Sequence, residues 1–389
     1  MYTPFAAATE RVPNFAASGL IIRSQGPSAP DPETQRLPRA IASLPGVADR
    51  HLNLAKQLER QLARFTDAGQ ADATVAESAR TLWRAAVSDV QNGLDDDRPL
   101  YWGRLALRRS VYRSALREKD SLLRSIEHYS RGMGDLRLGD DVLNVLITGF
   151  DPFHLDTRLD QSNPSGLAAL ALNGSEFGSG GGRARVCASI FPVRFEDFDD
   201  GIVERFFQQI LAEREPAMVV TLSMGRDAFD LERFPGRRRS AQDPDNHNVL
   251  TGASPDKPLP PGKTGSHLEG PEFLEFSLPV HAMRAADGHW PVRDNRWVTT
   301  IERGEFEAGS LADLQSQLAV RGSGGGYLSN EIAYRSRLLH GQLGCSCPIG
   351  HVHTPALQGH NAALERLMVG QIRQMLAQAA ASLTPRPPS

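Results

Sequence analysis

The chain has 389 residues, of which 40% are hydrophobic and 23% are charged, and its formal net charge at pH 7 is −3. This composition is typical of a soluble globular protein, and the length is enough for one large domain with additional segments or for two domains. The small negative charge gives no overall positive field for nucleic acid or for an anionic membrane, so we expect neither as a partner.

Three cysteines, Cys187, Cys345 and Cys347, are too few for a disulfide framework. The first residues have no basic start and reach charged side chains before any adequate apolar stretch, which argues against a secretory signal. The longest nearly apolar run, residues 142–150, is much shorter than the roughly 20 residues that cross a bilayer. We therefore expect a cytoplasmic protein in a reducing compartment.

Residues 1–47 contain scattered Pro, Ser, Ala and Gly without sustained periodicity, and we predict a poorly ordered arm there. Over residues 48–140 apolar side chains recur at helical spacing, with breaks at Gly69 and Pro99, which predicts an accessory unit of three helices. The third helix carries a row of arginines that we interpret as a solvated face. The row consists of Arg104, Arg108, Arg113, Arg117 and Arg124.

After residue 140 short apolar runs alternate with amphipathic stretches, which predicts a layered α/β domain over residues 141–382. Asn163 is placed as the N-cap of its first helix, with Pro164 in the first turn. The predicted fold is an open, twisted, mostly parallel sheet with helices on both faces, preceded by the all-helical N-terminal extension. Residues 383–389 form a Pro-rich tail. Strands are predicted at residues 142–147, 184–193 and 217–222, and later helices at residues 328–340 and 360–382.

Four segments place chemically useful residues at predicted strand ends or helix starts, where open α/β sheets form their sites. In residues 148–153 two aromatic side chains flank a Gly/Pro turn and could line an apolar slot, although such a turn is more often simply well packed. In residues 225–233 carboxylates could orient a base, although surface carboxylates are common. Neither segment is specific on its own.

The third segment is a glycine run, residues 322–326, followed by Ser329 at the start of a predicted helix. A side chain there lies at the positive end of the helix dipole, and free backbone N–H groups can hold a developing oxyanion. A phosphate-binding loop is the alternative. No Gly-Lys-Ser/Thr follows the glycines, and no clear strand and acidic partner frame a dinucleotide-binding motif, so we favour the oxyanion site.

The fourth segment, residues 345–355, contains Cys345, Cys347, His351 and His353. Sulfur and imidazole nitrogen are good zinc ligands, but the spacing is not that of a standard finger or ribbon. Alternate residues of a strand face the same side, so His351 and His353 would share a face, as catalysis requires. We favour a catalytic histidine with inert cysteines, and we expect no metal and no cofactor.

In this order, the segments resemble pyroglutamyl peptidase type I, the pyrrolidone-carboxylate peptidase family of cysteine peptidases, over roughly residues 142–378. The resemblance rests on the combination of motifs and not on any single one. These motifs are Gly149-Phe150-Asp151-Pro152-Phe153, Asn163-Pro164-Ser165, Phe191-Pro192-Val193, Gly225-Arg226, Glu232-Arg233, Pro244-Asp245-Asn246, Tyr327-Leu328-Ser329-Asn330 and His351-Val352-His353-Thr354-Pro355.

The resemblance implies an α/β peptidase without a cofactor that removes N-terminal pyroglutamate from peptides. By position, Glu232 would orient the histidine, His353 would act as base and then as acid, and Ser329 stands where the family has its catalytic cysteine. The residues that match the family's pyroglutamate pocket are Phe150, Phe153 and Asn163. A flat lactam fits between aromatic faces, with its amide hydrogen-bonded by the backbone.

Ser329 is the main departure from the family pattern. A thiol near a helix N-terminus and an imidazole ionises readily, whereas a serine hydroxyl must transfer its proton to a base as it attacks. Serine triads with a carboxylate-oriented histidine do work, so our first hypothesis is a serine hydrolase. The alternative is a catalytically inactive relative that binds capped peptides or acts as an interaction protein. Cys345 or Cys347 as a relocated nucleophile is disfavoured, because neither follows a glycine turn or begins a helix.

Two other departures affect the surroundings of the predicted site. Pro235, shortly after Glu232, should interrupt strand pairing. Residues 284–321 are longer than the corresponding stretch of the family, and we expect them to cover the site or an interface. The sequence leaves the oligomeric state open, and a homo-oligomer is among the options.

Overall fold

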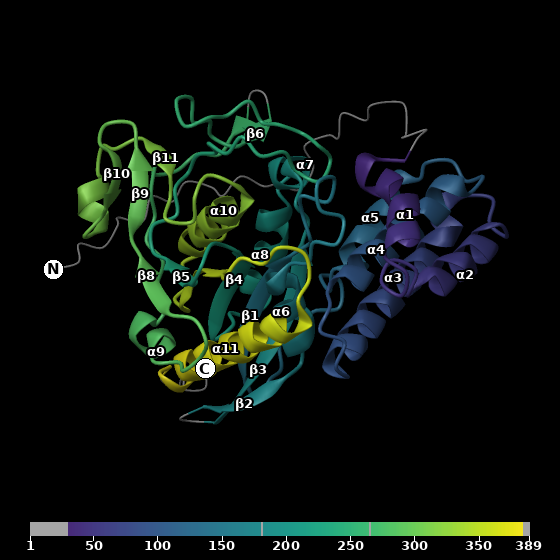
Figure 1. Cartoon of the computed structure of the whole chain (residues 1–389), viewed down its shortest axis with the longest axis horizontal. Helices are drawn as coiled ribbons and strands as arrows, with labels where there is room; N and C mark the ends of the chain where they lie inside the picture. The colour runs from purple at the N-terminus through teal and green to yellow at the C-terminus, as the bar shows by residue number, and fades with distance from the viewer. Residues whose placement is uncertain (1–29, 180–181, 264–265, 384–389) are drawn as a thin grey trace.

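The computed structural model describes residues 30–179, 182–263 and 266–383, and shows an α/β body with a bundle of helices against one side (Figure 1). Four of the six strand pairings in the main sheet are parallel, and the exceptions are β2 with β3 and β5 with β12. The predicted fold class is confirmed. In spatial order the strands are β2 (Glu176–Ser179), β3 (Gly182–Phe191), β1 (Leu143–Phe150), β4 (Met218–Met224), β12 (Ile349–Thr354), β5 (Phe229–Glu232) and β8 (Val292–Asn295).

Helices cover both faces of this sheet, and each face has its own apolar cluster. One face is covered by α6 (Pro164–Leu172), α9 (Val280–Arg284) and α11 (Ala362–Ala381). The other is covered by α7 (Phe195–Asp199), α8 (Ile202–Glu213) and α10 (Leu328–Gln342). Within the described ranges, no helix is both long and apolar enough to cross a lipid bilayer.

The turn between β1 and α6 follows the local sequence closely. Asn163 caps α6 as predicted, since its side-chain oxygen accepts the Ser165 backbone N–H at 3.1 Å, and Pro164 occupies the first turn. A Cβ at Gly149 would lie 2.2 Å from the Ser165 carbonyl oxygen. Strand and helix approach so closely here that only glycine fits at position 149.

Strand β5 ends at Glu232, as expected from the nearby proline. The long stretch that follows provides β8 to the main sheet and then a separate small sheet that packs around Phe234. Its elements are β9 (Trp297–Thr300), β10 (Gly304–Glu307), the 3₁₀ helix η1 (Leu311–Leu314) and β11 (Ala319–Arg321). A short hairpin of β6 (Gly262–Lys263) and β7 (Ser266–His267) lies in the preceding loop.

The N-terminal unit differs from its prediction in two ways. Three helices were predicted over residues 48–140, and the structure has four there. The predicted arm over residues 1–47 contains a further helix. That helix is capped by Asp31, whose side chain accepts the Thr34 N–H at 2.9 Å. Residues 1–29 and the end of the tail, residues 384–389, lie outside the described residues. The helices are α1 (Pro32–Ser43), α2 (Leu52–Leu62), α3 (Ala68–Gln91), α4 (Arg98–Arg113) and α5 (Asp120–Ser130).

The interpretation of the arginine row as a solvated face is wrong for Arg104 and Arg108, which are buried. Arg104 donates to Asp151 Oδ1 at 2.8 Å, and Arg131 donates to Asp151 Oδ2 at 2.7 Å. These three side chains are only 1–2% exposed. Buried charges need partners, so Asp151, at the end of β1, anchors the helical unit to the α/β body.

Glu127 of α5 forms a second ionic link between the two parts. Its carboxylate accepts hydrogen bonds from Arg108 and Arg131 of the helical unit and from Arg194, which follows β3. Burial opposes ionisation, but the guanidinium groups of Arg194, Arg131 and Arg108 outweigh it and hold the pKa of Glu127 well below its usual range. The carboxylate therefore stabilises the folded state in its charged form.

We expect this link to be lost in acid. Because its folded-state pKa is depressed, Glu127 stabilises the fold above its unfolded-state pKa of about 4.3, and this contribution disappears as the pH falls further. Glu127→Gln should lower the free energy of unfolding at pH 7 by about 3 kcal/mol, the lower end for a broken buried pair, because 17% of the side chain is exposed. Urea unfolding from pH 7 to pH 3 measures both effects.

The exposed Glu59 on α2 provides the control, since Glu59→Gln removes a carboxylate from the surface of the same helical unit. Its stability should stay within about 0.5 kcal/mol of the wild type. If Glu127→Gln lowers the free energy of unfolding by the same amount at pH 3 as at pH 7, the charged carboxylate does not have the stabilising role given to it.

Candidate active site

Glu232 and His353 form a hydrogen-bonded pair on one face of the main sheet. His353 Nδ1 lies 2.6 Å from Glu232 Oε1, and the Glu232 side chain is 0% exposed. In the antiparallel pairing of β5 with β12, Asp230 lies opposite His353. Because alternate residues face the same side, Glu232 shares this face and reaches His353 diagonally. Burial raises the pKa of the Glu232 carboxyl, and His353 partly offsets this effect.

This arrangement suits general-base chemistry. A carboxylate that accepts the Nδ1 hydrogen fixes the tautomer of the imidazole and leaves Nε2 with a lone pair. Asp230 does not compete for the ring, because its carboxylate accepts Arg293 Nε at 2.8 Å. The carboxylate predicted from the sequence to orient His353 is therefore the one that contacts it.

His351 lies beneath His353 as a fixed, neutral group. The two rings share a face as predicted, with centroids 4.9 Å apart and planes at 87°. His351 is fully buried, and its ring nitrogens contact the Thr221 and Ser223 hydroxyls, each at 2.8 Å. Burial, together with His353, holds the pKa of His351 well below its usual range. Both ring nitrogens are thus engaged, and His351 supports His353 without being able to exchange protons freely.

Position 225, directly after β4, requires a glycine because the backbone there packs against His353. A Cβ at this position would lie 2.5 Å from the His353 Cβ, and the Gly225 N–H donates to the Thr354 carbonyl at 2.8 Å. The backbone therefore packs directly against the histidine. A larger residue at position 225 would displace His353 from Glu232.

Asn295, at the end of β8, is the site residue that sequence reasoning missed. Its Nδ2 donates to Glu232 Oε2 at 2.8 Å and to the Ser323 carbonyl at 3.0 Å. Both oxygens of the Glu232 carboxylate are therefore hydrogen-bonded. Asn295 lies in the long 284–321 stretch, and the only available signal was an amide at the end of a short strand, which is too common to single out.

Ser329 lies in the first turn of α10, as predicted. Its side chain is half-buried, and its hydroxyl donates to the Gly324 carbonyl at 3.2 Å. Among the described residues no hydrogen bond joins Ser329 to His353. Tyr327, the N-cap residue of α10, makes no side-chain capping hydrogen bond, so its side chain satisfies none of the first N–H groups of the helix. This helix end can stabilise an anion.

The loop that carries Ser329 is bound to the segment that carries Glu232. The Phe234 N–H donates to the Ser323 hydroxyl, and the Ser323 N–H donates to the Phe234 carbonyl, both at 2.9 Å. Asn330 bonds Gly236 through both groups of its amide. Together with the contact from Asn295 to Ser323, these bonds bring the serine, histidine and carboxylate segments into one region of the sheet.

The three residues that match the family's pocket lie in different surroundings. Phe150 is only 3% exposed, and its ring stacks on Phe198 in the apolar cluster beneath α8 and α10. Phe153 is half-buried at the edge of the same cluster, as is Tyr327. The Asn163 side chain is occupied by the α6 cap and donates to the Asp151 carbonyl at 3.0 Å. Phe153 is the member of the set with substantial exposed surface.

The cysteines are not part of this site. Their neighbours His351 and His353 bond to hydroxyls and to Glu232, so the four residues do not form the zinc set considered from the sequence. Two other groups of potential ligands occur among the described residues. They are Glu215 with His340 and Cys347, and Asp31 with Glu33 and His247. Arg108 and Arg194 already pair with the carboxylates of the second group.

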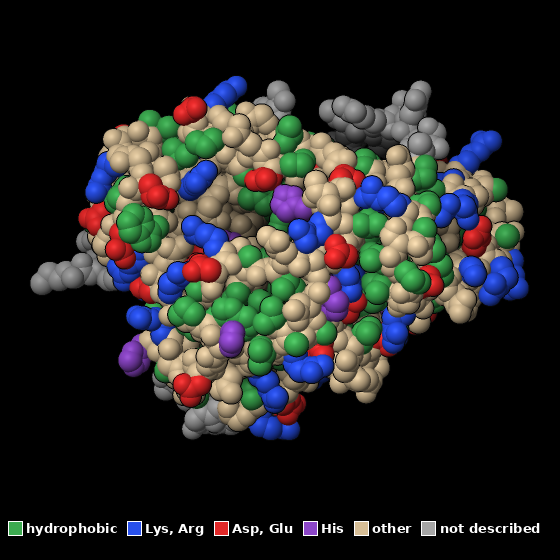
Figure 2. All heavy atoms as spheres, viewed as in Figure 1, with side chains coloured by type: hydrophobic (Ala, Val, Ile, Leu, Met, Phe, Trp, Pro, Cys, Tyr) green, Lys and Arg blue, Asp and Glu red, His purple; other side chains and the backbone are tan. Residues whose placement is uncertain are grey.

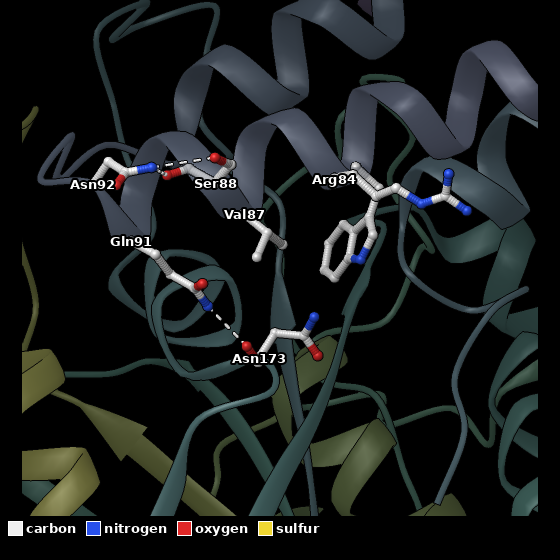
Figure 3. A pocket seen from close by; sticks show the side chains of 7 residues that line it. Arg84, Val87, Ser88, Gln91, Asn92 and Asn173 are labelled. Carbon is white, nitrogen blue, oxygen red and sulfur yellow. Dashed lines mark hydrogen bonds between the residues drawn. The ribbon is translucent and has the colours of Figure 1, made fainter.

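Figure 2 shows that this face of the molecule is hollowed over α10, with basic, acidic and histidine side chains around the rim. A separate cavity of about 480 Å³ lies between α3 and the end of α6 (Figure 3). None of the candidate site residues lines it. Two of its polar side chains are engaged by the protein, since Gln91 donates to the Asn173 carbonyl at 2.7 Å and Asn92 to the Ser88 carbonyl at 2.8 Å. This cavity is therefore distinct from the Glu232–His353 pair.

The fold and site define an α/β protein with a buried carboxylate–histidine pair, and the loop that precedes a serine at a helix start is hydrogen-bonded to the segment of the carboxylate. Two family models match the chain in order: the PA0049 N-terminal domain over residues 20–120, and the PA0049 C-terminal domain over residues 144–273 and 310–358. The second match includes Glu232, Ser329 and His353 and skips the segment of Asn295. A relative from Pseudomonas aeruginosa, the uncharacterized protein PA0049, is 26% identical over 385 residues, covering 74% of this chain and 70% of its own.

Solved structures of pyrrolidone carboxyl peptidase from Pyrococcus furiosus are also similar. One structure of that enzyme is 19% identical, with a TM-score of 0.43, and covers 62% of this chain and 100% of its own. A mutant form of the same enzyme is 20% identical, with the same TM-score and coverage. The likeness is distant, and nothing about the chemistry of this chain follows from it.

We expect Asn295→Ala to destabilise the protein. The change leaves Glu232 Oε2 and the Ser323 carbonyl, both in buried residues, without this donor, and an unsatisfied buried polar group costs about 1–3 kcal/mol. Urea unfolding at pH 7 measures the loss. Asn53→Ala on α2, where the side chain is exposed, is the control and should stay within about 0.5 kcal/mol of the wild type. If Asn295→Ala and Asn53→Ala are equally stable, the Asn295 hydrogen bonds do not support Glu232 and Asn295 is not a residue of the site.

Proposed function

We propose that the chain is a peptidase that removes N-terminal pyroglutamate from peptides, with Ser329 as nucleophile, His353 as base and then acid, and Glu232 as the orienting carboxylate. The observation that carries this proposal is the 2.6 Å contact between His353 Nδ1 and the fully buried Glu232 carboxylate. Such a pair, together with a serine at a helix start whose preceding loop is hydrogen-bonded to the Glu232 segment, has the parts of an acyl-transfer site. The motif resemblance supplies the substrate class.

In the first half of the reaction, His353 Nε2 takes the Ser329 hydroxyl proton as the oxygen attacks the pyroglutamyl carbonyl. The N–H groups at the start of α10 stabilise the resulting oxyanion, and Glu232 stabilises the imidazolium. In the structure the hydroxyl donates to Gly324, so attack requires it to turn toward Nε2. His353 then protonates the departing amine, and the C–N bond breaks to leave an acyl-serine.

In the second half, His353 takes a proton from water as the water oxygen attacks the acyl-serine. The proton returns to the Ser329 oxygen as the ester bond breaks, and free pyroglutamate leaves. Phe153 forms the aromatic side of the lactam pocket, the buried Phe150 ring anchors the same turn in the apolar cluster, and the Asn163 cap fixes that turn. Phe153, which has exposed surface, is the residue of this set that contacts the lactam.

A catalytically inactive binding protein is the second candidate. It is favoured by one contact, the bond of the Ser329 hydroxyl to the Gly324 carbonyl, because a hydroxyl that donates there does not donate to His353. This candidate keeps the pocket for pyroglutamyl peptides but lacks turnover. Saturable binding of a pyroglutamyl peptide in calorimetry, without release of a chromogenic amine, identifies it.

We expect purified protein to release the amine from a chromogenic pyroglutamyl amide. Ser329→Ala and His353→Ala should each lower kcat by at least about 1,000-fold, because triad members act as a unit. Thiol alkylation should have no effect on the wild type, since the nucleophile is an oxygen. Ser336→Ala, which removes another hydroxyl from α10, is the matched control and should keep full activity.

Two results would contradict the serine mechanism. One is activity that survives in Ser329→Ala, and the other is inactivation of the wild type by iodoacetamide. Ser329→Cys separates the two candidates further. If the wild type is inactive and this variant turns over substrate, the serine at position 329 is what prevents catalysis, and the rest of the pocket is intact.

A further inference from the structure

Glu215, His340 and Cys347 form a cluster of metal-ligand side chains outside the proposed active site. One ligand atom from each residue lies within 4.8 Å of the others. Glu215 follows α8, His340 is in the last turn of α10, and Cys347 precedes β12. His340 is 4% exposed and Cys347 is 5% exposed, whereas Glu215 is half-buried, so the cluster lies just beneath the surface.

The imidazole of His340 has the form that a metal ligand requires. Its Nε2 lies 2.9 Å from the Cys347 carbonyl oxygen, which can only accept, so Nε2 carries the hydrogen and Nδ1 carries the lone pair. Nδ1 is buried and makes no hydrogen bond with any described residue. A buried acceptor without a donor is costly unless a cation binds it.

The remaining groups suit a divalent transition metal. The backbone N–H groups of Ser346 and Cys347 donate to Glu215 Oε1, which fixes the carboxylate beside the thiol. A thiolate, a carboxylate and a neutral imidazole carry a total charge of −2, which neutralises a divalent ion. Sulfur and imidazole nitrogen favour zinc over magnesium or calcium, which prefer oxygen ligands alone.

We propose that Glu215, His340 and Cys347 bind a zinc ion that joins the end of α10 to the start of β12. Binding replaces the thiol hydrogen of Cys347 by a sulfur–zinc bond and releases one proton to solvent. Cys345 or water supplies the fourth ligand of a tetrahedral site. This set differs from the one considered from the sequence, because His351 and His353 face the active-site side of β12 and are engaged there.

The zinc ion would be structural, since it lies at the opposite ends of the two elements from the proposed catalytic residues. Ser329 is in the first turn of α10 and His340 in the last, while Cys347 precedes β12 and His353 is near its end. Fixing the distal ends of the helix and the strand restrains the separation of Ser329 from His353. The proposal does not depend on the peptidase activity.

The test uses the full chain, stripped with a chelator and titrated with cobalt. We expect absorption in the near ultraviolet from thiolate-to-cobalt charge transfer that saturates at one cobalt per chain and disappears on addition of one equivalent of zinc. Zinc should also raise the midpoint of thermal unfolding. A wild-type titration without charge-transfer absorption would overturn the proposal, and this result does not depend on whether any variant folds.

Variants identify the ligands. Cys347→Ser and His340→Gln should each weaken zinc binding by more than about 100-fold, since even outer-shell partners account for about 10- to 100-fold. Cys187→Ser replaces a buried cysteine of β3 and is the matched control, with unchanged affinity and unchanged cobalt absorption. Absorption that is lost in Cys187→Ser and retained in Cys347→Ser would place the ion elsewhere and refute this site.

Discussion

A carboxylate with no exposed surface must be paired, and this requirement on Glu232 organises the candidate site. One oxygen meets His353 and the other meets Asn295, so the imidazole is held in one tautomer and orientation. The antiparallel position of β5 beside β12 makes this contact geometrically available. Gly225 and His351 then restrict His353 from two other directions.

The helical unit contributes to the same architecture through buried charges. Asp151 follows directly from β1, in the turn whose aromatic residues are proposed to hold the lactam, and it is fixed by Arg104 and Arg131 of the helices. Glu127 adds a link to Arg194, which follows the neighbouring strand β3. Because such pairs are stable only when complete, the helices and the α/β body stabilise one another. The turn at Asp151 is thereby positioned by residues far away in the sequence.

Local chemistry made much of the site predictable. The cap at Asn163, the start of α10 before Ser329 and the shared face of His351 and His353 each follow from neighbouring residues, and all three are present. Arg104 and Arg108 were misjudged because a polar face of a helix has the same pattern whether it meets water or opposite charges. The helix at Pro32–Ser43 was missed because its buried side includes Glu33 and Arg36, whose partners lie in other segments.

Periodicity and short-range capping were enough to predict the class of fold, the principal strands and the residue types available for chemistry. The tertiary structure shows why His353 meets Glu232, as the motif resemblance implied, and not Asp230 on the same face, because the Asp230 carboxylate is engaged by Arg293. It also brought Asn295 to Glu232 and grouped Cys347 with His340 and not with His351. Contacts of this kind follow from strand order and packing, which no local pattern encodes.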